Sequence, residues 1–134
     1  MRTKETSADN EVPANLCDLI KDNYIINSSV LIKTEIMKKI KFDESKDKFA
    51  VEDYDLWLKL KSLKYNFFYL KEPLVGYRIH QNQISNKALR NTILLYLNIF
   101  MKGLPGKITM SERFLALYKA IRLVAYSIKN KIMK

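Results

Sequence analysis

The feature that most restricts the fold of this 134-residue chain is a change of pattern near residue 86. Before that point, apolar residues come in short runs that charged or turn-forming segments separate. After it, apolar residues recur every three or four positions over residues 86–102 and 111–128, which predicts two amphipathic helices. Gly103 and Pro105 between them form a helix stop signal. We therefore expect an α/β first part followed by a helical tail.

The first 85 residues predict a mixture of short elements. The expected helices cover residues 13–22, 35–40 and 52–63, and the expected strands cover residues 29–32, 66–70 and 74–78. Thr34 is expected to cap the second helix, Ser85 or Asn86 the first tail helix, and Ser111 the last helix. Strands this short bury little surface by themselves, so a sheet here needs covering helices or further strands.

Charge divides the chain at the same place. Residues 1–85 carry 14 basic and 13 acidic side chains, whereas residues 86–134 carry 10 basic side chains and one acidic side chain, Glu112. A basic amphipathic helix is typical of segments that lie on a membrane surface. We therefore expect residues 111–134 to contact an anionic membrane, the alternative being a packing helix with a solvated basic side.

The composition indicates in which cellular compartment the protein works and excludes some classes of metal site. Cys17 is the single cysteine and cannot form an internal disulfide, which favours a reducing compartment such as the cytosol. One cysteine and one histidine exclude a zinc-finger or iron–sulfur scaffold. Residues 1–12 lack the apolar stretch of a secretory signal, and no apolar run is long enough to predict a transmembrane helix. We expect a cytoplasmic protein that is peripheral at the inner face of the cell membrane.

Three carboxylates, those of Glu52, Asp53 and Asp55, gather at the start of the helix predicted over residues 52–63. Acidic residues favour helix N-termini because the free N–H groups and the macrodipole stabilise them, so capping alone can account for this cluster. The surrounding sequence gives it a second interpretation. An "S-S-V-L-I" strand, a "K-F-D-E-S" loop, the "E-D-Y-D-L-W-L-K-L" helix and a "Y-L-K-E-P-L-V-G-Y-R-I-H" segment follow one another between residues 24 and 85.

In order and spacing this series resembles the C-terminal half of bacterial family 2 glycosyltransferases, which have the GT-A fold. The resemblance implies that Asp53 is the catalytic base of an inverting transfer, because a carboxylate there takes the proton of the attacking acceptor hydroxyl. It implies that Glu52, Asp55 and Arg78 contact substrate. It also places His80 near a metal and the diphosphate. Arg78 in a structural ion pair and His80 as a hydrogen-bonding loop residue are the alternatives.

The resemblance also identifies what this sequence lacks. The family's N-terminal half binds the nucleotide-sugar donor and ends in a D-x-D motif, which would hold most of a divalent cation, Mg or Mn. No D-x-D lies upstream of the matched segment, and the glycine before the family's "F-D-E" is Lys41 here. The resemblance therefore implies an acceptor-side part of a GT-A domain at residues 1–85 and a basic helical tail at residues 86–134.

The expected function is the C-terminal portion of an inverting glycosyltransferase for hexosyl transfer. It would move a sugar from a nucleotide-sugar to a saccharide or lipid-linked acceptor of the cell envelope, and it would be inactive without the donor-binding half. One alternative is a non-enzymatic basic module that binds a membrane or nucleic acid. Net charge permits nucleic-acid binding, but no nucleic-acid motif accompanies the charge, so we expect no nucleic-acid partner. A scaffold partner of a complete transferase is the remaining alternative.

Overall fold

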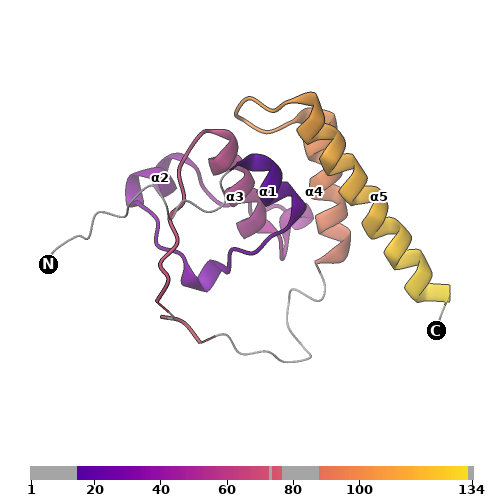
Figure 1. Cartoon of the computed structure of the whole chain (residues 1–134), viewed down its shortest axis with the longest axis horizontal. Helices are drawn as coiled ribbons and strands as arrows, with labels where there is room; N and C mark the ends of the chain where they lie inside the picture. Colours follow the sequence, from indigo (N-terminus) through magenta and orange to yellow (C-terminus); the bar gives the residue numbers. More distant parts are fainter. Residues whose placement is uncertain (1–14, 73, 77–87, 133–134) are drawn as a thin grey trace, which may run out of the picture.

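The computed structural model describes residues 15–72, 74–76 and 88–132, and helices make up most of them. Figure 1 shows α4 and α5 as an antiparallel pair beside α1 and α3, with α2 on the far side of the molecule from α5. The helices are α1 (Leu16–Lys21), α2 (Thr34–Lys39), α3 (Glu52–Ser62), α4 (Leu89–Lys102) and α5 (Met110–Ile132), with short 3₁₀ turns η2 (Asn27–Ser29) and η3 (Lys46–Lys48).

The expected α/β fold, a partial GT-A-like sheet with helices, is wrong for the described residues, which form no sheet. The runs predicted as strands at residues 29–32 and 66–70 contain extended backbone, but only Phe68 takes part in a β-bridge. β-branched and aromatic residues favour extended backbone locally, whereas a sheet also requires a neighbouring strand to complete its hydrogen bonds. Within these runs Leu31 is 94% exposed, whereas Val30, Ile32 and Phe67 are partly buried against the core, so the runs pack on helices without forming a sheet. The predicted strand at residues 74–78 is described only to residue 76.

The three helices predicted before residue 86 are confirmed, with different ends. Asn15 caps α1, since its Oδ1 accepts a hydrogen bond from the Asp18 backbone N–H at 3.0 Å. The prediction that Thr34 caps α2 is wrong, because Thr34 is the first residue of the helix and the capping position is Lys33. Beyond α3, Lys64 adopts a left-handed conformation with φ of 68°, and the Tyr65 N–H bonds back into the helix.

Both tail helices are also confirmed. α4 ends at Gly103, whose φ of 82° is the left-handed conformation expected of a stop signal. The predicted cap of α5, Ser111, is wrong: Thr109 and Glu112 cap each other instead. The Thr109 N–H donates to Glu112 Oε2 at 2.7 Å, and the Glu112 N–H donates to Thr109 Oγ1 at 3.2 Å, a reciprocal capping box. Predicted caps Ser85 and Asn86 lie outside the described residues.

One hydrophobic core joins the two parts of the chain that differ in composition. Its most deeply buried large side chains come from α1, α3 and α4 alike: Leu19, Ile20, Leu56, Trp57, Leu58, Leu95 and Ile99. α5 contributes Ala116 and Ala120, which are fully or nearly fully buried and small enough to let the helices approach closely. In the α4–α5 loop, a Cβ at Gly106 would lie 1.8 Å from the Ser62 carbonyl oxygen, so the loop needs glycine there.

A buried pair of tyrosines ties the core to the end of α1. The Tyr54 hydroxyl donates to the Leu19 carbonyl oxygen at 2.7 Å. The Tyr96 hydroxyl lies 3.0 Å from both the Tyr54 hydroxyl and the Ile20 carbonyl oxygen. Carbonyl groups in the last turn of a helix lack helical partners, so these hydroxyls satisfy them in a dry environment. Burial raises the pKa of both phenols, which therefore remain neutral.

Candidate functional site

The carboxylates singled out in the sequence lie in the first turn of α3, immediately after a strained residue. Ala50 has a φ of 66°, in the left-handed region that non-glycine residues rarely occupy. The next residue, Val51, is buried and starts the helix without a side-chain cap. The free N–H groups of the first turn need other acceptors, and Asp53 supplies one: its Oδ1 accepts a hydrogen bond from the Tyr54 N–H at 2.7 Å. The turn at Ala50 thus sets where α3 begins, and with it the position of the Glu52–Asp53 pair.

The Asp53 carboxyl is half-buried, and this environment changes its acidity. Burial raises its pKa above the ordinary aspartate value, and the neighbouring Glu52 charge adds to this effect. The hydrogen bond from the Tyr54 N–H opposes the rise without cancelling it. A carboxylate with a raised pKa accepts a proton more readily, which is the property that a general base needs. The expected position of a base at Asp53 is therefore chemically suitable.

An open pocket of about 530 Å³ lies at this end of α3. We call it the motif pocket, and its lining residues are Asp43, Glu44, Ser45, Lys46, Lys48, Phe49, Glu52 and Asn91. Two sequence motifs that are separated along the chain meet here: Asp43 and Glu44 of the "F-D-E" loop, and Glu52 of the "E-D" helix. One oxygen of Glu52, Oε2, is buried and has no hydrogen-bond partner among the described residues. A ligand hydroxyl is a donor that would satisfy such an oxygen.

Asp43 has the opposite electrostatic environment to Asp53. Its Oδ1 accepts a hydrogen bond from the Ser45 N–H at 3.1 Å. That bond, chiefly, and the Lys59 and Lys48 ammonium groups hold the pKa of the Asp43 carboxyl below its usual range. Two carboxyl groups near one end of α3 thus differ in acidity, with Asp43 held as the anion and Asp53 tuned toward accepting a proton.

Asp55, expected to bind substrate, lies at the centre of a buried ion-pair cluster. It is 2% exposed, and its two oxygens approach Lys48 Nζ at 2.6 Å and Lys59 Nζ at 2.5 Å. Removing one partner of such a buried cluster leaves an uncompensated charge. Lys48 also lines the motif pocket, so the cluster connects α3 to the pocket wall. In this arrangement lysine ammonium groups approach both oxygens of Asp55, and its expected contact with substrate stays a prediction.

Asn91 of α4 is a site residue that the sequence reasoning missed. Its Nδ2 donates to the Phe49 carbonyl oxygen at 2.9 Å and to the Lys46 carbonyl oxygen at 3.3 Å. Both carbonyls belong to the loop that forms the motif pocket and precedes the strained Ala50. The available signal was a polar residue in the apolar repeat of the first tail helix, where it is 9% exposed.

The other two expected site residues, Arg78 and His80, lie outside the described residues. Among residues 15–72, 74–76 and 88–132, no three His, Cys, Asp or Glu side chains are grouped so that they could hold a metal ion. The described residues therefore do not by themselves fit the divalent cation that the resemblance implies. No described helix combines the length and apolar character needed to cross a membrane.

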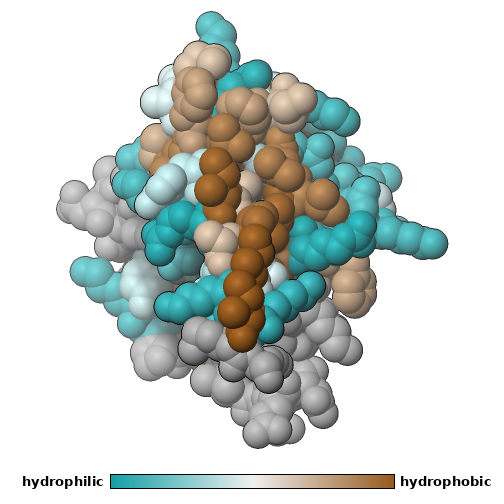
Figure 2. All heavy atoms as spheres, turned by 90° about the vertical axis from the view of Figure 1, so that its right-hand side faces the viewer, coloured by the Kyte–Doolittle hydropathy of each residue, from teal (hydrophilic) through white to brown (hydrophobic). Residues whose placement is uncertain are grey.

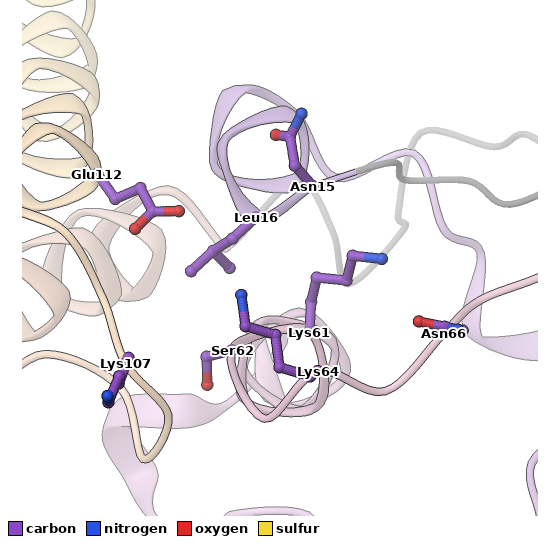
Figure 3. Close-up of a pocket in the computed structure, with 8 residues that line it drawn as sticks. All are labelled: Asn15, Leu16, Lys61, Ser62, Lys64, Asn66, Lys107 and Glu112. Carbon is purple, nitrogen blue, oxygen red and sulfur yellow. The ribbon is translucent and has the colours of Figure 1, made fainter.

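A second pocket, of about 220 Å³, lies at the opposite end of α3 (Figure 3). Its lining residues are Asn15, Leu16, Lys61, Ser62, Lys64, Asn66, Lys107 and Glu112. In Figure 3 the ends of the three lysines point in different directions. An α-helix of 11 residues is roughly 15 Å long, so this pocket is remote from the Glu52–Asp53 pair. The motif pocket is therefore the candidate site.

Comparison with known proteins gives one informative similarity. The chain is 34% identical over 59 residues to an uncharacterized glycosyltransferase of the archaeon Methanocaldococcus jannaschii. The matched stretch covers 44% of this chain and 20% of the archaeal protein, so the chain spans about a fifth of that relative's length. No family model matches the chain, and no solved structure matches it. The similarity supports a glycosyltransferase-like function at a coarse level.

Proposed function

We propose that this chain is the acceptor-side portion of an inverting glycosyltransferase, with Asp53 as the general base. The observation that carries the proposal is the half-buried Asp53, with its raised pKa, next in the chain to Glu52, which lines the pocket where the "F-D-E" and "E-D" motifs meet; Asp53 itself is not a lining residue. The similarity to a protein named as a glycosyltransferase supports the reaction class. The family 2 assignment and hexosyl transfer are parts of this proposal.

In the proposed step, an acceptor hydroxyl enters the motif pocket and attacks the anomeric carbon of a nucleotide-sugar. The new carbon–oxygen bond forms as the bond to the nucleoside diphosphate breaks, and the diphosphate leaves with the electron pair. Asp53 takes the hydroxyl proton. Glu52, whose Oε2 has no described hydrogen-bond partner, accepts a hydrogen bond from a second acceptor hydroxyl. Asp55 and Asn91 hold the helix and the loop that carry these groups.

The donor nucleotide and most of the binding of a divalent cation, Mg or Mn, are assigned to a donor-binding half with a D-x-D motif, with His80 near the cation, and no step here depends on the cation. The acceptor is a saccharide or lipid-linked saccharide of the cell envelope, used at the inner face of the cell membrane. We expect the isolated chain to have no transfer activity, because its sequence has no D-x-D motif upstream of the matched segment. Turnover of a nucleotide-sugar by the purified chain with Mg²⁺ would contradict that part of the proposal.

Replacement of Asp53 in a transferase that contains this chain tests the base. Asp53→Asn keeps the size and the hydrogen-bond acceptor but removes the basic group, so we expect kcat to fall about 10²–10⁴-fold. Asp47→Asn, an equally conservative change at an exposed residue of η3, is the matched control and should leave kcat unchanged. Retained turnover in Asp53→Asn would favour the scaffold alternative, in which this chain supports another catalytic polypeptide.

A further inference from the structure

The outer side of α5 carries an apolar stripe that the protein's own core does not use. The helix meets the core through Ala116 and Ala120, with Leu115 and Leu123 partly buried against it, while most of its other large apolar side chains are exposed. The members of the stripe are 41–79% exposed: Met110, Phe114, Tyr118, Ile121, Val124, Ile128 and Ile132. Figure 2 shows a brown band along this face with teal side chains on both sides. α5 therefore has apolar residues on its core side and, in addition, an exposed apolar stripe on its outer side, which an ordinary packing helix lacks.

Basic side chains border the stripe on both sides. With about 100° between successive residues, Arg122 and Lys129 lie along one edge and Arg113 and Lys131 along the other. On that second edge Arg113 donates to the Phe100 carbonyl oxygen at 3.4 Å, whereas Lys131 is exposed. The one acidic residue of α5, Glu112, is engaged in the capping box at the start of the helix. An apolar stripe between two rows of cations matches the boundary between acyl chains and anionic headgroups.

We propose that the outer face of α5 is a membrane-docking surface for anionic lipid, with the helix lying parallel to the bilayer plane. The apolar stripe enters the headgroup boundary, and the basic edges contact lipid phosphates. A second copy of the chain is a poorer occupant, because two such faces would bring their basic edges together. A nucleic acid would engage the cations but leave the apolar stripe in water. The inference goes beyond the proposed transfer reaction and does not depend on it.

Vesicle co-sedimentation of the full chain tests the proposal. Phosphatidylcholine vesicles are compared with vesicles that also contain phosphatidylglycerol, and we expect strong binding only to the second kind. Each basic side chain removed from an anionic surface weakens binding about fivefold, so Arg122→Gln with Lys129→Gln should cost roughly 25-fold. The matched control, Lys38→Gln with Lys39→Gln, removes the same charge from exposed positions of α2, away from α5, and should retain binding.

The apolar stripe is tested by Ile121→Ser with Ile128→Ser, which we expect to weaken binding about tenfold per residue. Both residues are exposed, so an unchanged thermal transition verifies that the variant is folded. Equal binding by both vesicle types, or binding unchanged in the serine variant, would overturn the proposal. So would a dimer in light scattering that the serine variant abolishes, or tight binding to a DNA oligonucleotide by that variant. Asp53→Asn should not alter vesicle binding, which separates this test from that of the transfer reaction.

Discussion

Large apolar side chains are exposed in two regions of the molecule, before α4 and in the α4–α5 pair, but they lie on different kinds of backbone. Leu31 and Leu74 lie on segments without regular secondary structure that belong to no sheet in the described structure. Such backbone satisfies its N–H and C=O groups with water or with a neighbouring chain. The exposed stripe of α5 lies on a helix, which satisfies those groups internally. Because a helix needs no outside partner for its backbone, the exposed stripe of α5 is compatible with the lipid surface proposed for it.

The largest expected effect is a difference in the free energy of unfolding between the core side and the outer side of the α4–α5 pair. Ile99→Ala empties a fully buried position of α4 and should lower the free energy of unfolding by about 2–5 kcal/mol. Ile121→Ala, the same change on the outer face of α5, should cost less than about 0.5 kcal/mol. Urea titration followed by circular dichroism measures both. Similar losses at the two sites would mean that the outer face of α5 contributes to the fold.

The next effect tests how strongly the tail supports the pocket. Asn91→Ala leaves the Lys46 and Phe49 carbonyl oxygens without their side-chain donor and should lower the free energy of unfolding by about 1–3 kcal/mol. Amide hydrogen exchange should accelerate selectively over residues 46–51. Asn98→Ala, at a half-buried position of the same helix, controls for the loss of an amide. Unchanged exchange in the loop would show that α4 does not hold the pocket.

A smaller effect, of opposite sign, concerns the far end of α3. Lys64 is held in the left-handed region, where glycine has no steric penalty. Lys64→Gly should therefore raise the free energy of unfolding by about 1 kcal/mol, although glycine also gains freedom in the unfolded chain. Thermal unfolding measures the change. A lower transition temperature would indicate that the Lys64 side chain contributes more than its backbone conformation costs.

The smallest effect is a pH dependence at Asp53. Its pKa is raised in the folded state, so the contribution of this carboxyl to stability is present below the ordinary aspartate pKa. That contribution is lost as the pH rises through the raised pKa. Asp53→Asn removes the titration, so the variant should gain in Tm relative to the unsubstituted protein as the pH increases across that range. A difference in Tm that stays constant with pH would contradict the raised pKa.

The helices could be predicted from the sequence because their signals are local. Gly103 stops α4, Asn15 caps α1, and a Thr109-x-x-Glu112 pattern was available to place the start of α5. The predicted sheet is not formed by the described residues, because β-branched runs favour extended backbone without specifying a neighbouring strand. The expected membrane contact of residues 111–134 stays a prediction, because periodicity identifies an amphipathic helix but does not say whether its apolar face meets the core or another medium.

The candidate site was partly predictable for a similar reason. The Glu52–Asp53 pair and its place at the start of a helix follow from the order of residues. Its meeting with Asp43 and Glu44, and the clamp from Asn91, depend on contacts between distant parts of the chain. The roles given to Arg78 and His80 remain predictions, since neither residue is described.

Trp57, the single tryptophan, makes the protein its own optical reporter. The indole is 2% exposed, packs edge-on against Phe67 with ring centroids 6.3 Å apart, and has no described hydrogen-bond partner for its Nε1. Its fluorescence should peak at short wavelength and shift to the red only when the core around α3 opens. Docking through α5 should leave that emission unchanged. Intrinsic fluorescence can therefore follow unfolding while the protein is bound to vesicles, without an added label.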